Sequence, residues 1–100
     1  MYIIIWEYQV KPEKRTEFEK IYAANGAWAE LFKKGTGYLG TELLYKADQP
    51  PCFLTIDRWA SKQAYETFLT HWASEYKFLD AQCEGLTEQE SLLGTWSSTA

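Results

Sequence analysis

Four segments of the chain are predicted to form β-strands, and the first of them shows most clearly the alternation of hydrophobic positions that is typical of a strand. In the first segment, residues 2–10, the even-numbered positions form one apolar face: Tyr2, Ile4, Trp6, Tyr8 and Val10. Ile3 and Ile5 make the opposite face apolar too. The other three predicted strands are residues 38–46, 52–59 and 90–98. The sequence ADQPP (47–51) is a stiff connection of hairpin length between the second and third strands.

The segments between these strands have the period of about 3.6 residues that is typical of helices. Pro12 suits the first turn of a helix, and Phe18, Ile21 and Tyr22 follow at helical spacing. A second, short helix is predicted within residues 26–35. The first crossover is therefore expected to contain a helix with a short helix appended.

A longer helix is predicted after the third strand. Ser61 caps its start and Gly85 ends it. Its apolar positions keep one phase over more than twenty residues: Tyr65, Phe68, Leu69, Trp72, Tyr76, Leu79 and Cys83. We therefore expect one continuous amphipathic helix.

The order of elements, β-α-β-β-α-β, predicts a single α+β domain over residues 1–100 with a ferredoxin-like arrangement. Right-handed crossovers place both helices on one face of a four-stranded, largely antiparallel sheet. The other face is left uncovered, yet the strands are apolar on both sides. We therefore expect a homodimer in which two sheets pack face to face, as in a dimeric α/β-barrel.

Asp57 and Arg58 interrupt the third strand, LTIDRW (54–59), and alternation sends them to opposite faces. Two interpretations are open. In the structural one, Arg58 pairs with Glu42 of the neighbouring strand, and Asp57 accepts a hydrogen bond from a tyrosine or a backbone amide. In the functional one, one of the two residues lines a pocket.

Composition narrows the classes of partner. The net charge of −4 disfavours nucleic acid, while five Trp and seven Tyr favour a pocket or an interface. With no export signal or membrane-spanning segment, the expected location is the cytoplasm, away from membranes, with Cys52 and Cys83 reduced. A single histidine, His71, disfavours a metal site, and no nucleotide-binding motif is present.

Several segments resemble the antibiotic biosynthesis monooxygenase family of dimeric α/β-barrels. They are the aromatic first strand, GYLGTEL (37–43), LTIDRW (54–59) and SKQAYETFLTHW (61–72), with the junction WASKQA (59–64) most similar. The resemblance implies either oxidation of polycyclic phenols by O₂ without a cofactor or degradation of haem. The haem-degrading members have Asn, Trp and His where this chain has Glu7, Phe68 and Phe78. We therefore expect no haem and no other cofactor.

We predict a pocket between sheet and helices for a planar aromatic ligand. Its expected substrate-binding residues are Trp6, Tyr8, Trp28 and Trp59, although plain core packing is the alternative for each. Asp57 or Asp80 is the expected base, and Arg58 or Tyr76 the expected stabiliser of the substrate anion. Asp80 lies one helical turn after Tyr76.

The function that these residues predict is cofactor-independent monooxygenation of a small aromatic or quinone-like metabolite. Two alternatives stay open. One is a non-catalytic dimeric module that binds a small ligand or serves in stress responses. The other is an isomerase or decarboxylase, because proton removal from an activated carbon needs the same groups without O₂.

Overall fold

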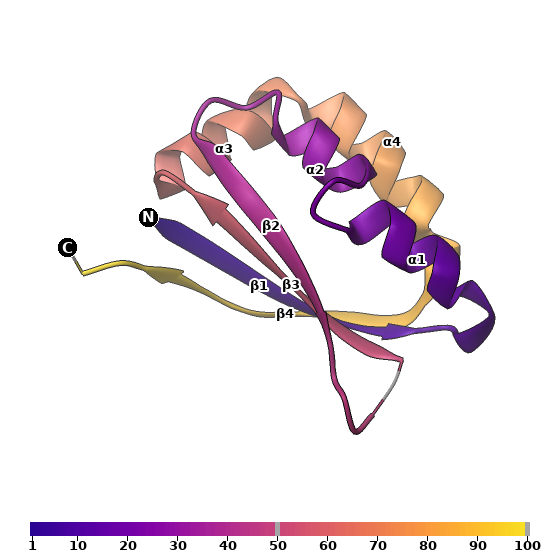
Figure 1. The fold of residues 1–100 in the computed structure, drawn as a ribbon. Helices are drawn as coiled ribbons and strands as arrows, with labels where there is room; N and C mark the ends of the chain where they lie inside the picture. Colours follow the sequence, from indigo (N-terminus) through magenta and orange to yellow (C-terminus); the bar gives the residue numbers. More distant parts are fainter. Residues whose placement is uncertain (50, 100) are drawn as a thin grey trace.

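The computed structural model describes residues 1–49 and 51–99, and Figure 1 shows its two layers, a twisted sheet with helices on one face. The chain runs through β1 (Tyr2–Val10), a 3₁₀ turn η1 (Pro12–Lys14), α1 (Arg15–Tyr22), α2 (Ala27–Phe32), β2 (Tyr38–Tyr45), β3 (Cys52–Trp59), α3 (Lys62–His71), α4 (Ala73–Cys83), a 3₁₀ turn η2 (Glu84–Leu86) and β4 (Thr87–Ser97). The strand order is β2-β3-β1-β4, and all neighbours are antiparallel. The predicted α+β ferredoxin-like fold is therefore confirmed.

The register of β3 settles where Asp57 and Arg58 point. Asp57 lies opposite Ile4 of β1 and Thr41 of β2, and like these residues it is buried beneath the helices. Arg58 faces the other side of the sheet. The predicted separation of the two side chains onto opposite faces is confirmed.

The prediction of one continuous helix after β3 is wrong, because the helical segment is divided at Trp72 into α3 and α4. The backbone of Trp72 (φ −113°, ψ 28°) lies outside the helical region, although its N–H still donates to Phe68 O at 2.9 Å. The bend allows the two halves of the apolar stripe to pack on different partners. Phe68 of α3 packs on Trp59, with ring centroids 5.2 Å apart, whereas Tyr76 of α4 packs on Trp28 at 5.0 Å.

Three smaller boundaries also differ from the prediction. Pro12 begins a 3₁₀ turn rather than the α-helix itself. Gly85 lies inside η2, because α4 already ends at Cys83, and β4 starts at Thr87 rather than residue 90.

The predicted cap is confirmed, since Ser61 Oγ accepts a hydrogen bond from the Ala64 N–H at 3.0 Å. Pro50 of the predicted 47–51 connection lies outside the described residues.

The core between the sheet and the helices is mainly aromatic. Its largest fully buried side chains are Phe18, Phe53, Trp59 and Phe68. Cys52 and Cys83 are also buried, each as a free cysteine. A cavity remains within this layer, lined by aromatic rings from both the sheet and the helices.

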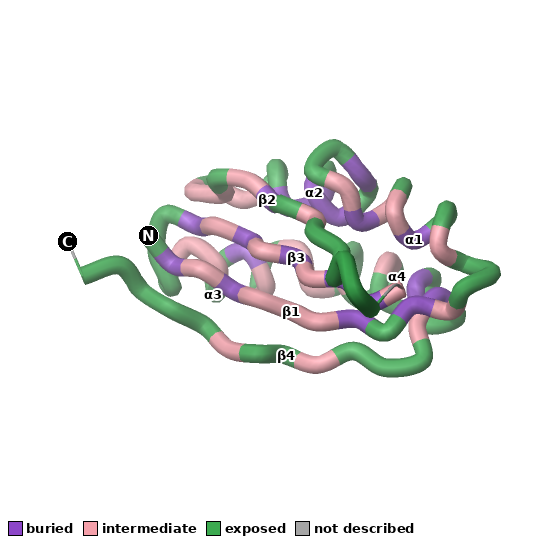
Figure 2. The backbone as a smooth tube through the Cα atoms, turned by 60° about the horizontal axis from the view of Figure 1, so that its bottom comes forward, coloured by how far each residue is buried: buried purple, intermediate pink, exposed green. Residues whose placement is uncertain are grey.

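The face of the sheet opposite the helices is uncovered, and Figure 2 turns it toward the viewer. The central strands place half-buried apolar side chains on it: Ile3, Ile5, Leu54 and Ile56. Leu44 of β2 and Trp96 of β4 extend this surface and are 44% and 50% exposed. We refer to these six residues as the open face. No helix in the described part of the chain is long and apolar enough to cross a membrane.

Candidate active site

A partly open cavity of about 140 Å³ lies between the sheet and the helices. Aromatic rings form most of its walls: Trp6, Tyr8, Tyr22, Trp28, Phe32 and Tyr76. Its polar groups are Thr41, Thr55, Asp57, Asp80 and Glu90. An apolar cavity of about 150 Å³ is known to accommodate benzene, so this space suits an aromatic ring.

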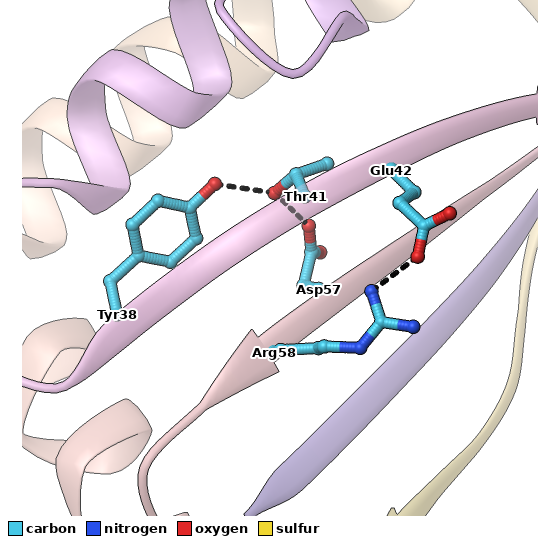
Figure 3. A network of polar contacts seen from close by, with 5 residues as sticks. All are labelled: Tyr38, Thr41, Glu42, Asp57 and Arg58. Carbon is cyan, nitrogen blue, oxygen red and sulfur yellow. Dashed lines mark hydrogen bonds and ion pairs between the residues drawn. The ribbon is translucent and has the colours of Figure 1, made fainter.

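Asp57 stands at the buried end of the cavity and is held by a chain of hydroxyl groups (Figure 3). Thr41 Oγ1 donates to Asp57 Oδ1 at 2.6 Å, and Tyr38 Oη lies 2.6 Å from Thr41 Oγ1. Because the single Thr41 hydroxyl proton is given to Asp57, Tyr38 donates to Thr41. The order of donation is therefore Tyr38 to Thr41 to Asp57, which orients the carboxylate and leaves Oδ2 for a ligand.

Burial raises the pKa of Asp57 from 3.8 to about 6, although the hydrogen bond from Thr41 lowers it. Asp57 is 7% exposed, which explains why desolvation dominates. At neutral pH most Asp57 side chains are ionised, yet their affinity for a proton exceeds that of an ordinary aspartate. Asp57 therefore has the properties of a general base.

The phenols of the cavity remain protonated. Burial raises the pKa of Tyr8, Tyr22 and Tyr76 well above the ordinary tyrosine value. Tyr8 Oη also lies 3.0 Å from Thr55 Oγ1, within hydrogen-bond distance. These tyrosines can donate hydrogen bonds to a ligand, but a tyrosinate base is not available at neutral pH.

Asp80 of α4 and Glu90 of β4 are exposed residues that line the cavity and form its mouth. Burial and the nearby charge of Asp80 both raise the pKa of Glu90. The lining drawn from the described residues includes no lysine, arginine or histidine. The cavity is thus acidic as well as aromatic.

The structure brings together six of the eight predicted site residues. Those on the cavity wall are Asp57, Tyr76, Asp80, Trp6, Tyr8 and Trp28. Arg58 lies on the other side of the sheet, where its guanidinium pairs with Glu42 (Figure 3). Trp59 is fully buried in the core against Phe32 and Phe68, outside the cavity lining. Their positions correct the expectation that both contact the ligand.

The structural interpretation of Arg58, an ion pair with Glu42, therefore agrees with the structure. For Asp57 that interpretation named a tyrosine or a backbone amide as the donor, whereas the donor is the Thr41 hydroxyl. Sequence reasoning also missed Thr41, Tyr22 and Glu90. Thr41 was detectable in principle, because pairing the second and third strands places a residue opposite Asp57. Counting from the hairpin identifies Thr41, because the register runs without a shift from the pair of Tyr45 and Phe53 to the pair of Thr41 and Asp57. The irregularity between Tyr38 and Gly40 lies beyond this pair.

We expect Thr41→Val to raise the pKa of Asp57 above its value of about 6, because the substitution keeps the shape of the side chain but removes the donor that lowers this pKa. A pH titration of the Asp57 carboxyl carbon by NMR measures the change. Tyr38→Phe is the control, since it leaves the bond between Thr41 and Asp57 in place, and it should shift the pKa less. An unchanged pKa in Thr41→Val would show that the hydroxyl does not tune Asp57.

The structure thus defines a small ferredoxin-like α+β protein with a buried carboxylate in an aromatic cavity between sheet and helices. The chain belongs to the antibiotic biosynthesis monooxygenase family, because the model of that family matches residues 1–82. The match includes every predicted site residue.

Solved structures share this fold at low sequence identity. A variant of SnoaB, a cofactor-independent oxygenase from Streptomyces nogalater, is 19% identical with a TM-score of 0.73, over 99% of this chain and 93% of that one. A candidate antibiotic biosynthesis monooxygenase from Deinococcus radiodurans is 17% identical with a TM-score of 0.77, over 100% and 94%. A variant of MhuD is 20% identical with a TM-score of 0.70, over 100% and 96%. No curated protein matches the chain.

The MhuD variant holds two manganese protoporphyrin IX molecules per active site, which raises the question of a haem site here. The residues of this chain do not fit one. Phe68 is buried in the core, Phe78 is 68% exposed, and His71 does not line the cavity. Within residues 1–49 and 51–99, no cluster of His, Cys, Asp and Glu side chains is arranged to hold a metal ion.

Proposed function

We propose that this protein is a cofactor-independent monooxygenase that acts on a small phenolic or quinone-like aromatic compound. The observation that carries the proposal is Asp57, a buried carboxylate whose pKa is raised to about 6 at the end of an aromatic cavity. Family membership supports the reaction type, and SnoaB is a cofactor-independent oxygenase of the same fold.

The reaction begins with proton transfer, because triplet O₂ reacts slowly with closed-shell molecules. Asp57 removes a proton from the activated carbon or hydroxyl of the substrate, and the hydroxyl groups of Tyr8 and Tyr76 are available to stabilise the resulting anion. The anion gives one electron to O₂, and the substrate radical and superoxide combine into a peroxide anion. This anion takes the proton back from Asp57 and becomes a hydroperoxide. Loss of water from the hydroperoxide leaves a carbonyl group. A methylene group and O₂ thus become a carbonyl group and water.

Anthrone is a suitable probe, because its methylene carbon becomes electron-rich when the ketone enolises. With ¹⁸O₂ we expect the protein to accelerate oxygen uptake and to place one labelled oxygen in the anthraquinone product. A chelator should leave the rate unchanged. Uptake no faster than in a protein-free solution would contradict the proposal, and turnover that persists without air would favour an isomerase or decarboxylase instead.

We further propose that the open face is covered by a second copy of the chain. Six apolar side chains lie on this face around the ion pair of Arg58 and Glu42. A monomer would expose this surface to water, whereas a two-fold dimer buries it and lets the two charges remain paired. The helices already cover the opposite face (Figure 1). Dimerisation through the open face therefore leaves the cavity of each chain on the far side of its sheet.

A further inference from the structure

The acidic groups of the cavity are divided between its buried end and its mouth. Asp57 lies opposite Ile4 of β1, whereas Glu90 lies opposite Tyr8 of the same strand and on its other side. Four residues along a strand correspond to roughly 13 Å. A ligand that reaches both ends must therefore be elongated and carry a suitable group at each end.

The mouth has an uncompensated negative charge. Asp80 raises the pKa of Glu90, which shows that the two carboxylates act on each other. The ion pairs within residues 1–49 and 51–99 involve other acids, namely Glu19, Glu30 and Glu42. A positive group entering the mouth is attracted by both carboxylates, and a negative group is repelled.

The aromatic walls favour a positively charged ligand, and the buried end favours a ligand with a hydrogen-bond donor. Trp28 and Tyr76 meet edge to face with ring centroids 5.0 Å apart, and the faces of such rings attract cations. Asp57 is more than nine-tenths buried, and only its Oδ1 is bonded among the described residues, so Oδ2 is left for a donor on the ligand. Trp28 Nε1 is likewise buried in the wall without a hydrogen-bond partner in the described part of the chain.

We infer that the cavity takes a hydroxylated aromatic amine, with its ring hydroxyl at Asp57 and its protonated amino group between Asp80 and Glu90. The position of the hydroxyl rests on the proposed function, because Asp57 is the base of that reaction. The preference for a positive charge is a property of the mouth and does not depend on turnover. Aromatic carboxylates and phosphates are disfavoured by the same field.

Three phenols of nearly equal size test this inference: tyramine, tyrosol and 4-hydroxyphenylacetate, which carry a positive, a neutral and a negative side chain. Binding is measured by calorimetry without oxygen, so no reaction occurs. At low ionic strength we expect tyramine to bind at least about tenfold more tightly than 4-hydroxyphenylacetate, with tyrosol between them. The difference should shrink at about 0.5 M salt, where exposed charges are screened.

The double variant Asp80→Asn/Glu90→Gln should reduce the difference between tyramine and 4-hydroxyphenylacetate to less than about threefold. The double variant Glu17→Gln/Glu66→Gln is the matched control, because it removes two exposed charges away from the cavity. Equal or tighter binding of 4-hydroxyphenylacetate, or no binding of any probe, would overturn the inference. Labelled oxygen in anthraquinone would still support the oxygenase, so the two proposals can fail separately.

Discussion

Replacing Asp57 by asparagine is expected to abolish most oxygenase activity and at the same time to stabilise the fold. Removing a positioned general base lowers a rate by about 10²- to 10⁴-fold. The amide keeps an oxygen that can accept the Thr41 hydrogen bond but has no affinity for the substrate proton. Oxygen uptake with anthrone measures this loss.

The stability gain follows from the raised pKa. Because the pKa of Asp57 rises from 3.8 in an ordinary environment to about 6 in the fold, the folded state holds its proton more tightly than the unfolded chain. The contribution of Asp57 to stability is therefore greatest below about pH 4 and is lost as the pH rises through about 6. Asparagine does not ionise, so the variant does not lose stability as the pH rises. Its free energy of unfolding at neutral pH should therefore exceed that of the wild type by up to about 3 kcal/mol.

Urea unfolding at acidic and neutral pH tests the stability of the Asp57→Asn variant. The two proteins should be similarly stable near pH 4 and should diverge toward neutral pH. Asp48→Asn, in the exposed turn after β2, changes the net charge equally and is the control. Full activity in Asp57→Asn would remove Asp57 as the base. A less stable variant would show that the carboxylate is needed for the fold.

Ile5→Asp is expected to convert the proposed dimer into monomers. Ile5 lies in the middle of the central strand β1, opposite Ile56 of β3 and Gly94 of β4, and its side chain belongs to the open face. A carboxylate buried there without a partner costs several kcal/mol, which weakens association by at least about 10²-fold. Because Ile5 is only half-buried within one chain, the variant monomer should still fold.

Sedimentation velocity measures the mass of the Ile5→Asp variant, and circular dichroism checks its fold. Phe78→Asp is the matched control, because Phe78 is 68% exposed on α4, on the helical side of the molecule. We expect this control to remain a dimer. A wild-type protein that sediments as a monomer, or an Ile5→Asp variant that stays dimeric, would contradict sheet-to-sheet association.

The order of the elements, the antiparallel α+β fold and the faces of the regular strands β1 and β3 follow from the sequence alone. Alternation separated Asp57 from Arg58 and showed Ile3 and Ile5 opposite the helix-facing set. These properties depend on periods of 2 and 3.6 residues, which are local and need no knowledge of distant neighbours. The helical period was misleading at Trp72, because packing against separate partners bent a helix whose apolar stripe is continuous.

Which side chains meet depends on the tertiary structure. Tyr38 bonds Thr41 across a register irregularity in β2, and Glu90 reaches the cavity because β4 pairs with β1 at the edge of the sheet. The same packing placed Trp59 in the core and Trp28 on the cavity wall, although both are large aromatic residues in apolar segments. The physical reason is that periodicity specifies a face, whereas the neighbours on that face are set by strand pairing and ring packing between segments far apart in the chain.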